Sequence, residues 1–220
     1  MTIEAITKDT LESLAVFPLP STVLFPGTAL PLHVFEQRYL NMVRTILEKG
    51  GALAIVRLRD EEVTTGSVPP DLCDIACAGR IVHVDELPNG RLNILVHGLE
   101  RVRLLEELPL LDGYRRFRAD FVPTIQTDGA GVQLARLQSC LLSLKSAVGD
   151  KDKELVHVLN STADPLQLAD ILSAVLVHEP DIRQQLLAED DLSARLKKLI
   201  DAVADLMVRI EEPDPGAKLN

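Results

Sequence analysis

The spacing of apolar and polar residues changes near the middle of the chain. Before about residue 123 the chain consists mainly of short apolar runs and alternating stretches, which are typical of β-strands. Residues 51–58 form a largely apolar run behind a glycine pair, which predicts a buried strand. Residues 101–105 and 114–122 alternate apolar and polar side chains, so each predicts a strand with one solvated face. The first half of the chain is therefore expected to be mostly β-structure.

One hairpin and one helix can be located within this half. Residues 80–87 and 91–97 flank the sequence Pro88-Asn89-Gly90, and Asn-Gly supplies the positive φ angles that a tight hairpin turn requires. From about residue 36 to 49, apolar residues recur at helical spacing, and a glycine pair then ends the helix. The apolar stripe of this helix is expected to consist of Tyr39, Leu40, Met42, Val43, Ile46 and Leu47.

The segment before that helix is dense in proline, glycine and aromatic residues. Pro26-Gly27 predicts a type II turn, because proline sets φ at the second position and glycine supplies a positive φ at the third. Pro31 predicts an edge strand, a strand start or a bulge, since it has no N–H to donate. Phe35 and Tyr39 have nearly the spacing of a hydrophobic staple, and Arg38 is expected to pair with a nearby carboxylate. We interpret the segment as mainly architectural, with any binding site next to it.

The second half of the chain has helical periodicity. Apolar stripes predict helices over residues 132–147 and 192–210. Asp164-Pro165 predicts the start of another helix, because Asp can accept from the first free N–H groups and Pro has a suitable φ. Pro180 is expected to end that helix. Several amphipathic helices joined by short loops form a small bundle.

Together the two halves predict an α+β fold in which the β-rich part, with one inserted helix, precedes an α-helical bundle. No aromatic residue follows Phe121, and a polar, glycine-bearing segment follows at residues 124–131. This change of composition predicts a β-rich subdomain over residues 12–125 and a helical subdomain over residues 126–212. Residues 213–220 are expected to be a frayed tail.

Composition narrows the classes of function. The chain of 220 residues has 33 acidic and 23 basic side chains and a net charge of −10, which disfavours binding to nucleic acids or anionic membranes. Three cysteines are too few for a disulfide framework and suit a reducing compartment. We found no signal peptide and no apolar run long enough to span a membrane. These features predict a soluble cytoplasmic protein.

Motifs for catalysis and for metal binding are missing from the sequence. It contains no phosphate-binding Gly-x-x-x-x-Gly-Lys-Ser/Thr loop, no Gly-x-Ser-x-Gly elbow and no His-Glu-x-x-His helix. Ser143 and Lys145 are two positions apart on a predicted helix, so they point in different directions and do not form a dyad. Cys73 and Cys77 lack the second ligand pair of a closed zinc site, and we interpret them as small apolar fillers. No catalytic residue, metal or cofactor is predicted.

Four arginines recur at strand spacing and predict a locally basic face if their strands are neighbours. One interpretation is a solvated strand face, which would also block pairing with other chains. The other is contact with an anion or with RNA, although few aromatic residues are interleaved for stacking on bases. These arginines are Arg101, Arg103, Arg116 and Arg118.

Three collinear blocks of the sequence resemble the N-terminal domain of Lon proteases. The first is Phe17-Pro-Leu-Pro-Ser-Thr-Val-Leu-Phe-Pro-Gly-Thr-Ala-Leu-Pro-Leu-His-Val-Phe-Glu-Gln-Arg-Tyr-Leu40. The second is Leu87-Pro-Asn-Gly-Arg-Leu-Asn-Ile-Leu-Val-His-Gly-Leu-Glu-Arg-Val102. The third begins at Asp164-Pro-Leu-Gln-Leu-Ala-Asp-Ile-Leu172 and continues from Gln184 to Leu196. No single motif among them is specific, but the three in order are.

The resemblance implies a PUA-like β pseudo-barrel followed by a helical bundle. It also implies a region that recognises and holds protein substrates. The ATPase and Ser–Lys peptidase of the family would lie further along, so the resemblance implies a stand-alone form without either activity. It provides no catalytic residues in this region.

These features are compatible with three functions. The first is a non-catalytic module that binds unfolded or extended polypeptide segments or a protein partner, in a groove beside Phe35, Tyr39 and Met42. The second is an RNA-binding PUA-like module that uses the four arginines. The third is an enzyme with a pocket in the barrel, for which the sequence offers no set of catalytic residues.

Overall fold

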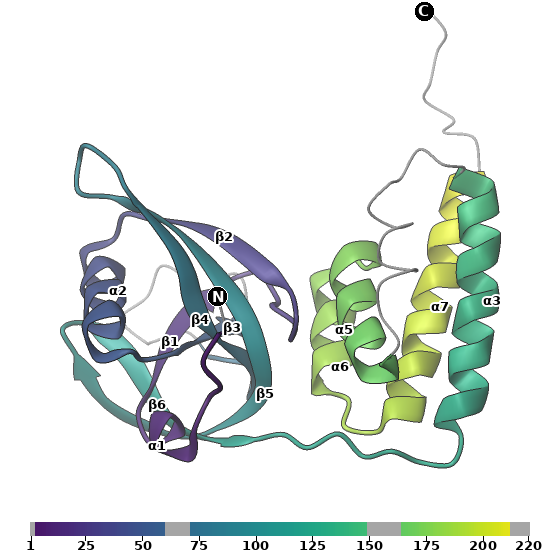
Figure 1. The fold of residues 1–220 in the computed structure, drawn as a ribbon, viewed down its shortest axis with the longest axis horizontal. Helices are drawn as coiled ribbons and strands as arrows, with labels where there is room; N and C mark the ends of the chain where they lie inside the picture. The colour runs from purple at the N-terminus through teal and green to yellow at the C-terminus, as the bar shows by residue number, and fades with distance from the viewer. Residues whose placement is uncertain (1–2, 60–70, 149–163, 212–220) are drawn as a thin grey trace, which may run out of the picture.

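The structure is a computed structural model that describes residues 3–59, 71–148 and 164–211. Its strands lie at one end of the molecule together with the helices that precede residue 50, and the helices that follow residue 129 lie at the other end (Figure 1). The strands are β1 (Leu14–Leu19), β2 (Ala29–Val34), β3 (Leu53–Arg57), β4 (Ile75–Glu86), β5 (Leu92–Leu111) and β6 (Tyr114–Phe121). The helices are α1 (Lys8–Leu11), α2 (Gln37–Lys49), α3 (Ala130–Val148), α5 (Pro165–Leu176), α6 (Pro180–Ala188) and α7 (Leu192–Glu211).

The six strands form one sheet that closes on itself. Its order is β2-β5-β4-β3-β1-β6, and β6 also pairs with β5, which completes a barrel. Strand β5 makes this closure possible because it is 20 residues long and changes partner along one edge. Residues 92–97 pair with β2, whereas residues 102–111 pair with β6. The separate strands predicted at residues 91–97 and 101–105 are therefore parts of one strand.

The predicted type II turn at Pro26-Gly27 is confirmed and lies against this change of partner. Gly27 has φ +74°, and the Thr28 N–H donates to the Phe25 carbonyl over 3.2 Å. The Gly27 N–H also donates to the Gly98 carbonyl of β5 over 2.9 Å. A Cβ atom at Gly98 would lie 2.4 Å from the Phe25 carbonyl oxygen, so only glycine lets the turn approach the strand this closely.

Two further turn and edge predictions have different outcomes. Pro31 lies on β2, whose only strand partner among the described residues is β5, so the predicted edge strand is confirmed. The hairpin of β4 and β5 is also present, but in its turn only Gly90 has a positive φ, whereas we predicted positive values from Asn-Gly together. The Gly90 N–H donates to the Leu87 carbonyl over 3.0 Å. Pro88 and Asn89 are therefore the two central residues of the turn, and Gly90, which has the positive φ, follows them.

Helix α2 forms as its periodicity predicts and ends at Gly50, which has φ +64°. Its buried residues are Tyr39, Leu40, Met42, Val43 and Ile46, whereas Leu47 is 49% exposed and was wrongly placed in the stripe. Tyr39 stacks on Phe17 of β1 with ring centroids 4.3 Å apart. The predicted staple between Tyr39 and Phe35 is wrong, because Phe35 is 60% exposed. Arg38 pairs with Glu36 as expected, over 2.8 Å.

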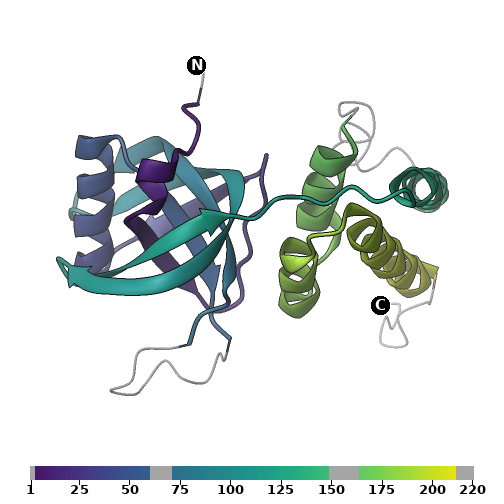
Figure 2. The ribbon, with the colours of Figure 1, turned by 90° about the horizontal axis from the view of Figure 1, so that it is seen from below.

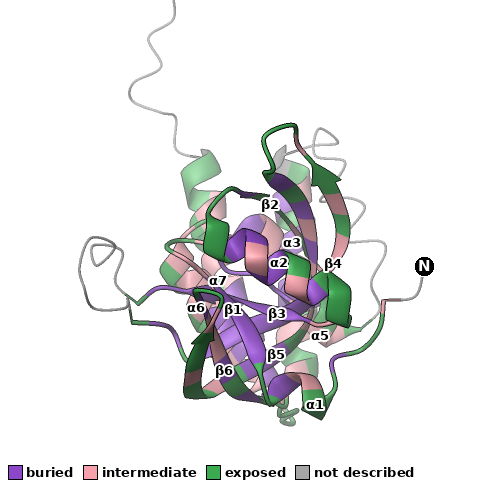
Figure 3. Ribbon diagram, turned by 90° about the vertical axis from the view of Figure 1, so that its left-hand side faces the viewer, coloured by how far each residue is buried: buried purple, intermediate pink, exposed green. Residues whose placement is uncertain are grey.

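Strands β1 and β3 are buried on both faces. Phe17 and Ile55 belong to a hydrophobic cluster that includes α2 and the helical part. Val16 and Ala54, next to them in the sequence, belong to a second cluster that includes residues of the N-terminal segment. A strand buried on both faces has no polar alternation, which is why residues 51–58 are an almost continuous apolar run. Figure 3 shows these strands in purple behind α2.

The helical part contains one helix more than the periodicity predicted between residues 164 and 190. Asp164 caps α5 as expected, accepting from the Leu166 N–H over 3.2 Å. Helix α5 ends before Pro180, as predicted, but Pro180 is also the first residue of a further helix, α6. Helices α5 and α6 lie next to the barrel, and α3 and α7 lie beyond them (Figures 1 and 2). The division at residue 125 remains a prediction, and residues 213–220 lie outside the described residues.

Candidate functional site

Helix α6 joins the bundle to the barrel through polar side chains that bond to backbone. Arg183 Nη2 donates to the Val23 carbonyl over 3.0 Å, and Gln184 Nε2 donates to the Ile75 carbonyl over 2.9 Å. Arg57 of β3 pairs with Asp181 over 2.7 Å. Sequence analysis did not predict this helix, so these contacts were missed with it.

Arg101, which we predicted as an anion contact, is buried at the end of α6. Its Nη1 donates to the Leu187 and Glu189 carbonyls over 2.9 and 2.8 Å. Its Nη2 donates to the Pro123 carbonyl and to Thr124 Oγ1 over 3.2 and 3.0 Å. A cation here suits the negative end of the helix dipole and satisfies carbonyls that the helix leaves free. The prediction is wrong for Arg101, because its donors are used to attach the bundle to the barrel.

A second buried arginine completes this junction. Arg195 of α7 is fully buried; its Nη1 donates to Asp170 Oδ1 over 2.9 Å and its Nη2 donates to the Glu189 carbonyl over 2.9 Å. Burial raises the pKa of Asp170 to about 6, which outweighs the opposing effect of Arg195 and Arg101. Burial, followed by the nearby charge of Arg195, lowers the pKa of Arg101 to about 10. We call Arg101, Asp170, Glu189 and Arg195 the junction cluster.

Two of the other arginines that were predicted to contact an anion lie next to carboxylates of the chain itself. Arg103 lies 3.8 Å from a carboxylate oxygen of Asp190. Arg118 pairs with Glu106 over 2.8 Å and with Glu12 over 3.2 Å. The four arginines therefore do not form one free basic face, which removes the arrangement on which the RNA interpretation depended.

The remaining arginine, Arg116, lines a hollow in the surface of the β-rich part. The hollow has a volume of about 380 Å³ and lies between α1, α2 and the β6 end of the barrel. Figure 3 looks onto the face of the molecule that presents these elements. Its lining consists of Asp9, Thr10, Ser13, Ala15, Thr45, Ile46, Lys49, Gly50, Gly51, Ala52, Leu111, Tyr114 and Arg116. We call it the α1–α2 hollow.

Neutral groups are the hydrogen-bond partners of Arg116 in this hollow. Its Nη1 donates to Ser13 Oγ over 2.8 Å, and its Nη2 donates to the Pro109 carbonyl over 2.9 Å. Its Nε is buried without an acceptor. Tyr114 has a pKa above its ordinary value because of burial, opposed by a hydrogen bond with Thr45, so its phenol is neutral at pH 7.

The predicted polypeptide groove beside Phe35, Tyr39 and Met42 does not form as one surface. Tyr39 is 6% exposed and Met42 is fully buried, so both belong to the core. Phe35 alone is exposed, near the ring of His33 at 6.0 Å. The prediction is wrong for Tyr39 and Met42 because the apolar stripe of α2 faces the barrel and not a groove.

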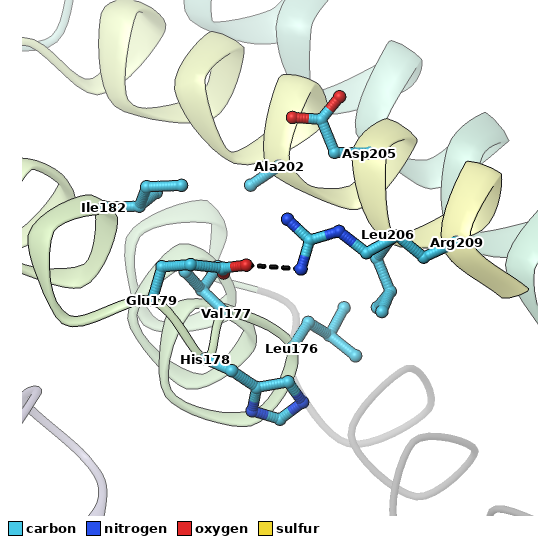
Figure 4. A pocket seen from close by; sticks show the side chains of 9 residues that line it. All are labelled: Leu176, Val177, His178, Glu179, Ile182, Ala202, Asp205, Leu206 and Arg209. Atoms are coloured by element: carbon cyan, nitrogen blue, oxygen red, sulfur yellow. Dashed lines mark hydrogen bonds and ion pairs between the residues drawn. The ribbon is translucent and has the colours of Figure 1, made fainter. Parts of the chain in front are cut away.

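A second, much smaller hollow lies in the bundle, between α7 and the α5–α6 connection. It has a volume of about 20 Å³, enough for about one water molecule. Figure 4 shows Glu179 and Arg209 paired across it, with Leu176, Ile182 and Leu206 around them. Because the ion pair crosses the space, this hollow offers no room for a ligand.

The structure describes no metal centre and no membrane span. Among the described residues, no group of three or more His, Cys, Asp or Glu side chains could hold a metal ion. Burial raises the pKa of the Cys73 and Cys77 thiols, which disfavours the thiolate that binds metals or attacks substrates. None of the described helices is long and apolar enough to cross a membrane.

Comparison with known proteins identifies the family. The family model of the ATP-dependent protease La (LON) substrate-binding domain matches residues 13–205. The chain belongs to this family. The Lon protease of Paraburkholderia phytofirmans is 28% identical over 196 residues, and Lon protease 2 of Myxococcus xanthus is 27% identical over 204 residues. Each alignment covers 88% of this chain and 24% of the relative, so the chain spans about a quarter of these proteins.

Two solved structures of the family share the fold. The N-terminal domain of a Mycobacterium avium complex Lon protease has a TM-score of 0.71 at 20% identity, and the alignment covers 88% of this chain and 98% of that one. A Lon N-terminal domain protein from Xanthomonas campestris has a TM-score of 0.61 at 23% identity, covering 86% and 97% of the two chains. The α+β fold expected from the resemblance is thus confirmed.

Sequence analysis missed most of the α1–α2 hollow. Ser13, Thr45, Lys49 and Tyr114 come from four separate segments, and no motif connects them. One local signal existed, since Thr7 accepts from the Thr10 N–H as the N-cap of α1, and such a cap predicts the short helix. Arg116 was predicted as a contact, but for a basic face that the fold does not build.

Proposed function

We propose that this protein is a non-catalytic module that binds polypeptide segments. The observation that supports this most is the match of residues 13–205 to a substrate-binding domain family. Its relatives are named as proteases, and the substrates of a protease are polypeptides.

The α1–α2 hollow is the proposed contact site. At about 380 Å³ its volume falls within the range of roughly 300–1,000 Å³ that is usual for ligand sites. Ala15, Ile46 and Leu111 supply apolar lining, while several hydroxyl groups supply hydrogen-bonding atoms. Such a mixture suits one or two side chains of an extended segment, with the neighbouring backbone at the rim.

A binding assay with a blocked hollow tests this proposal. We expect a fluorescently labelled, reduced and alkylated protein, which cannot refold, to bind the wild type and to raise the fluorescence anisotropy. Ser13→Phe should weaken this binding at least tenfold, because an exposed residue of the lining becomes bulky with little cost to the fold. Ser21→Phe is the matched control, since Ser21 is also exposed and lies outside the lining.

Three results would count against the proposal. Absence of binding to the unfolded protein by the wild type would refute polypeptide binding itself. Equal weakening by Ser13→Phe and Ser21→Phe would refute the hollow as the contact site. Full displacement of the unfolded protein by structured RNA, with a steep dependence on salt, would favour a nucleic-acid ligand instead.

A further inference from the structure

Arg116 differs from neighbouring arginines on the barrel in how its charge is balanced. Arg103, Arg115 and Arg118 each lie within 4 Å of a carboxylate oxygen. No such ion pair involves Arg116 among the described residues, and its partners are the Ser13 hydroxyl and the Pro109 carbonyl. A guanidinium stays charged at neutral pH, so the positive charge of Arg116 is not compensated within the hollow.

The other lining residues leave the hollow positive. Lys49 adds a second cation and Asp9 the only carboxylate, so the lining has two positive charges and one negative charge. The chain as a whole has a net charge of −10. A positive hollow on an acidic protein attracts an anionic group locally while the rest of the surface repels polyanions.

The chemistry of the hollow points to the anion that it would take. We propose that the α1–α2 hollow binds a carboxylate of a polypeptide, held by Arg116 and Lys49. Guanidinium groups bind carboxylates through charge-assisted hydrogen bonds, which are about twice as strong as neutral ones. Each Nη of Arg116 carries two N–H groups, and the hydrogen bonds to Ser13 and Pro109 use one on each, so an oxygen of the ligand can accept from the others.

Apolar lining beside the cations favours a peptide over a small inorganic anion. Ile46 and Leu111 would contact the aliphatic part of the residue that bears the carboxylate. The carboxylate could belong to the end of a chain or to an Asp or Glu side chain, and the hollow offers the same chemistry to both. This inference rests on the proposed polypeptide binding and names the group that is recognised.

Three labelled peptides distinguish the sources of the carboxylate. The first is an apolar decapeptide with a free C-terminal carboxylate, the second is the same peptide amidated, and the third is amidated with one internal Glu. We expect at least one of the two acidic peptides to bind about tenfold more tightly than the neutral amide, as one charge-assisted bond of about 1.4 kcal/mol implies. A preference for the first peptide alone assigns the chain end, and a preference for the third alone assigns a side chain.

Variants of the hollow connect this preference to Arg116. We expect Arg116→Met to abolish the preference and Arg116→Lys to retain part of it, because lysine keeps the charge without the planar fork. Arg118→Met is the matched control, since Arg118 lies two residues along the same strand and is paired with Glu106 and Glu12. If Arg116→Met does not fold by circular dichroism, Lys49→Met at an exposed position should still reduce the preference about threefold.

The outcomes separate this inference from the proposed function. If the wild type binds unfolded protein but binds all three peptides equally, the carboxylate site is refuted and polypeptide binding stands. If Arg116→Met folds and keeps the full preference, or if Arg118→Met loses it equally, the assignment to Arg116 is refuted. If neither the unfolded protein nor any peptide binds, both proposals fall.

Discussion

The junction cluster and the α1–α2 hollow both place arginines at the edge of the barrel, but they satisfy them differently. In the junction cluster Arg101 and Arg195 are buried, and their guanidinium groups donate to carbonyls, a hydroxyl and a carboxylate. In the hollow Arg116 is partly exposed, is bonded to neutral groups alone and has a buried Nε without an acceptor. One region is filled, while the other contains about 380 Å³ of space.

This contrast separates structural from ligand-binding arginines. An arginine whose donors are all satisfied by its own chain has little left to offer a ligand, and its removal leaves partners unpaired. An arginine with an uncompensated charge beside open space can gain more from a ligand than it contributes to the fold. We therefore expect changes in the junction cluster to alter stability, and changes in the hollow to alter binding.

The largest expected effect is that of Arg195→Met. Methionine has a similar length but no charge, so the buried carboxyl of Asp170 would lose its ion-pair partner. We expect a loss of about 3–5 kcal/mol in the free energy of unfolding at pH 7, measured by urea denaturation. Lys197→Met, at an exposed position of the same helix, is the control and should change stability by less than about 0.5 kcal/mol. A loss below about 1 kcal/mol for Arg195→Met would show that the junction pair is not structurally important.

The pH dependence of stability gives a smaller, signed test of the same region. The pKa of Asp170 is about 6 in the folded protein, above its ordinary value of 3.8, so the folded state binds this proton more tightly than the unfolded state. The contribution of Asp170 is therefore most favourable below pH 4, falls as the pH rises to about 6, and is constant above that. The difference between 3.8 and about 6 corresponds to a total change of up to about 3 kcal/mol in the free energy of unfolding.

Asp170→Asn supplies the reference for this measurement, because asparagine does not titrate. The free energy of unfolding of the wild type minus that of Asp170→Asn should decrease between pH 4 and pH 6 and then level off. Other titrating groups cancel in this difference. A difference that increases with pH, or that does not change, would contradict the raised pKa.

The smallest expected effects on stability are those of the barrel arginines outside the junction cluster. Arg116→Met removes two hydrogen bonds to neutral acceptors at a partly exposed position, so we expect it to cost about 1–2 kcal/mol of unfolding free energy. Arg118→Gln removes exposed ion pairs and should cost less than about 0.5 kcal/mol. Thermal denaturation of both variants beside Arg195→Met measures the contrast. A loss of 3 kcal/mol or more for Arg116→Met would place Arg116 with the structural arginines.

Local patterns in the sequence predicted the elements that depend on neighbouring residues. These patterns predicted helix α2 with its glycine stop, the hairpin of β4 and β5, and the cap of α5. Helix α6 was missed because Pro180 is compatible with both the end of one helix and the start of the next. The single long β5 was missed because Gly98 interrupts its pattern, and only contact with the Pro26-Gly27 turn explains that glycine.

The site was less predictable than the fold. Strand alternation placed Arg101 and Arg116 together as possible anion contacts. Whether each arginine is buried or beside open space depends on helices that are distant in sequence, α6 for Arg101 and α1 with α2 for Arg116. Spacing within a strand contains no information on those neighbours.

The sequence by itself determined most of the elements, the family and the acidic net charge, because these depend on local propensity, on apolar periodicity and on composition. Tertiary structure alone decided which charged side chains are satisfied. Arg101 is part of the core because the end of α6 packs onto it, whereas Arg116 faces a hollow between segments at least 30 residues apart. Whether a charged side chain has hydrogen-bond and ion-pair partners depends on every group within a few ångströms. Those groups come from parts of the chain that only folding brings together.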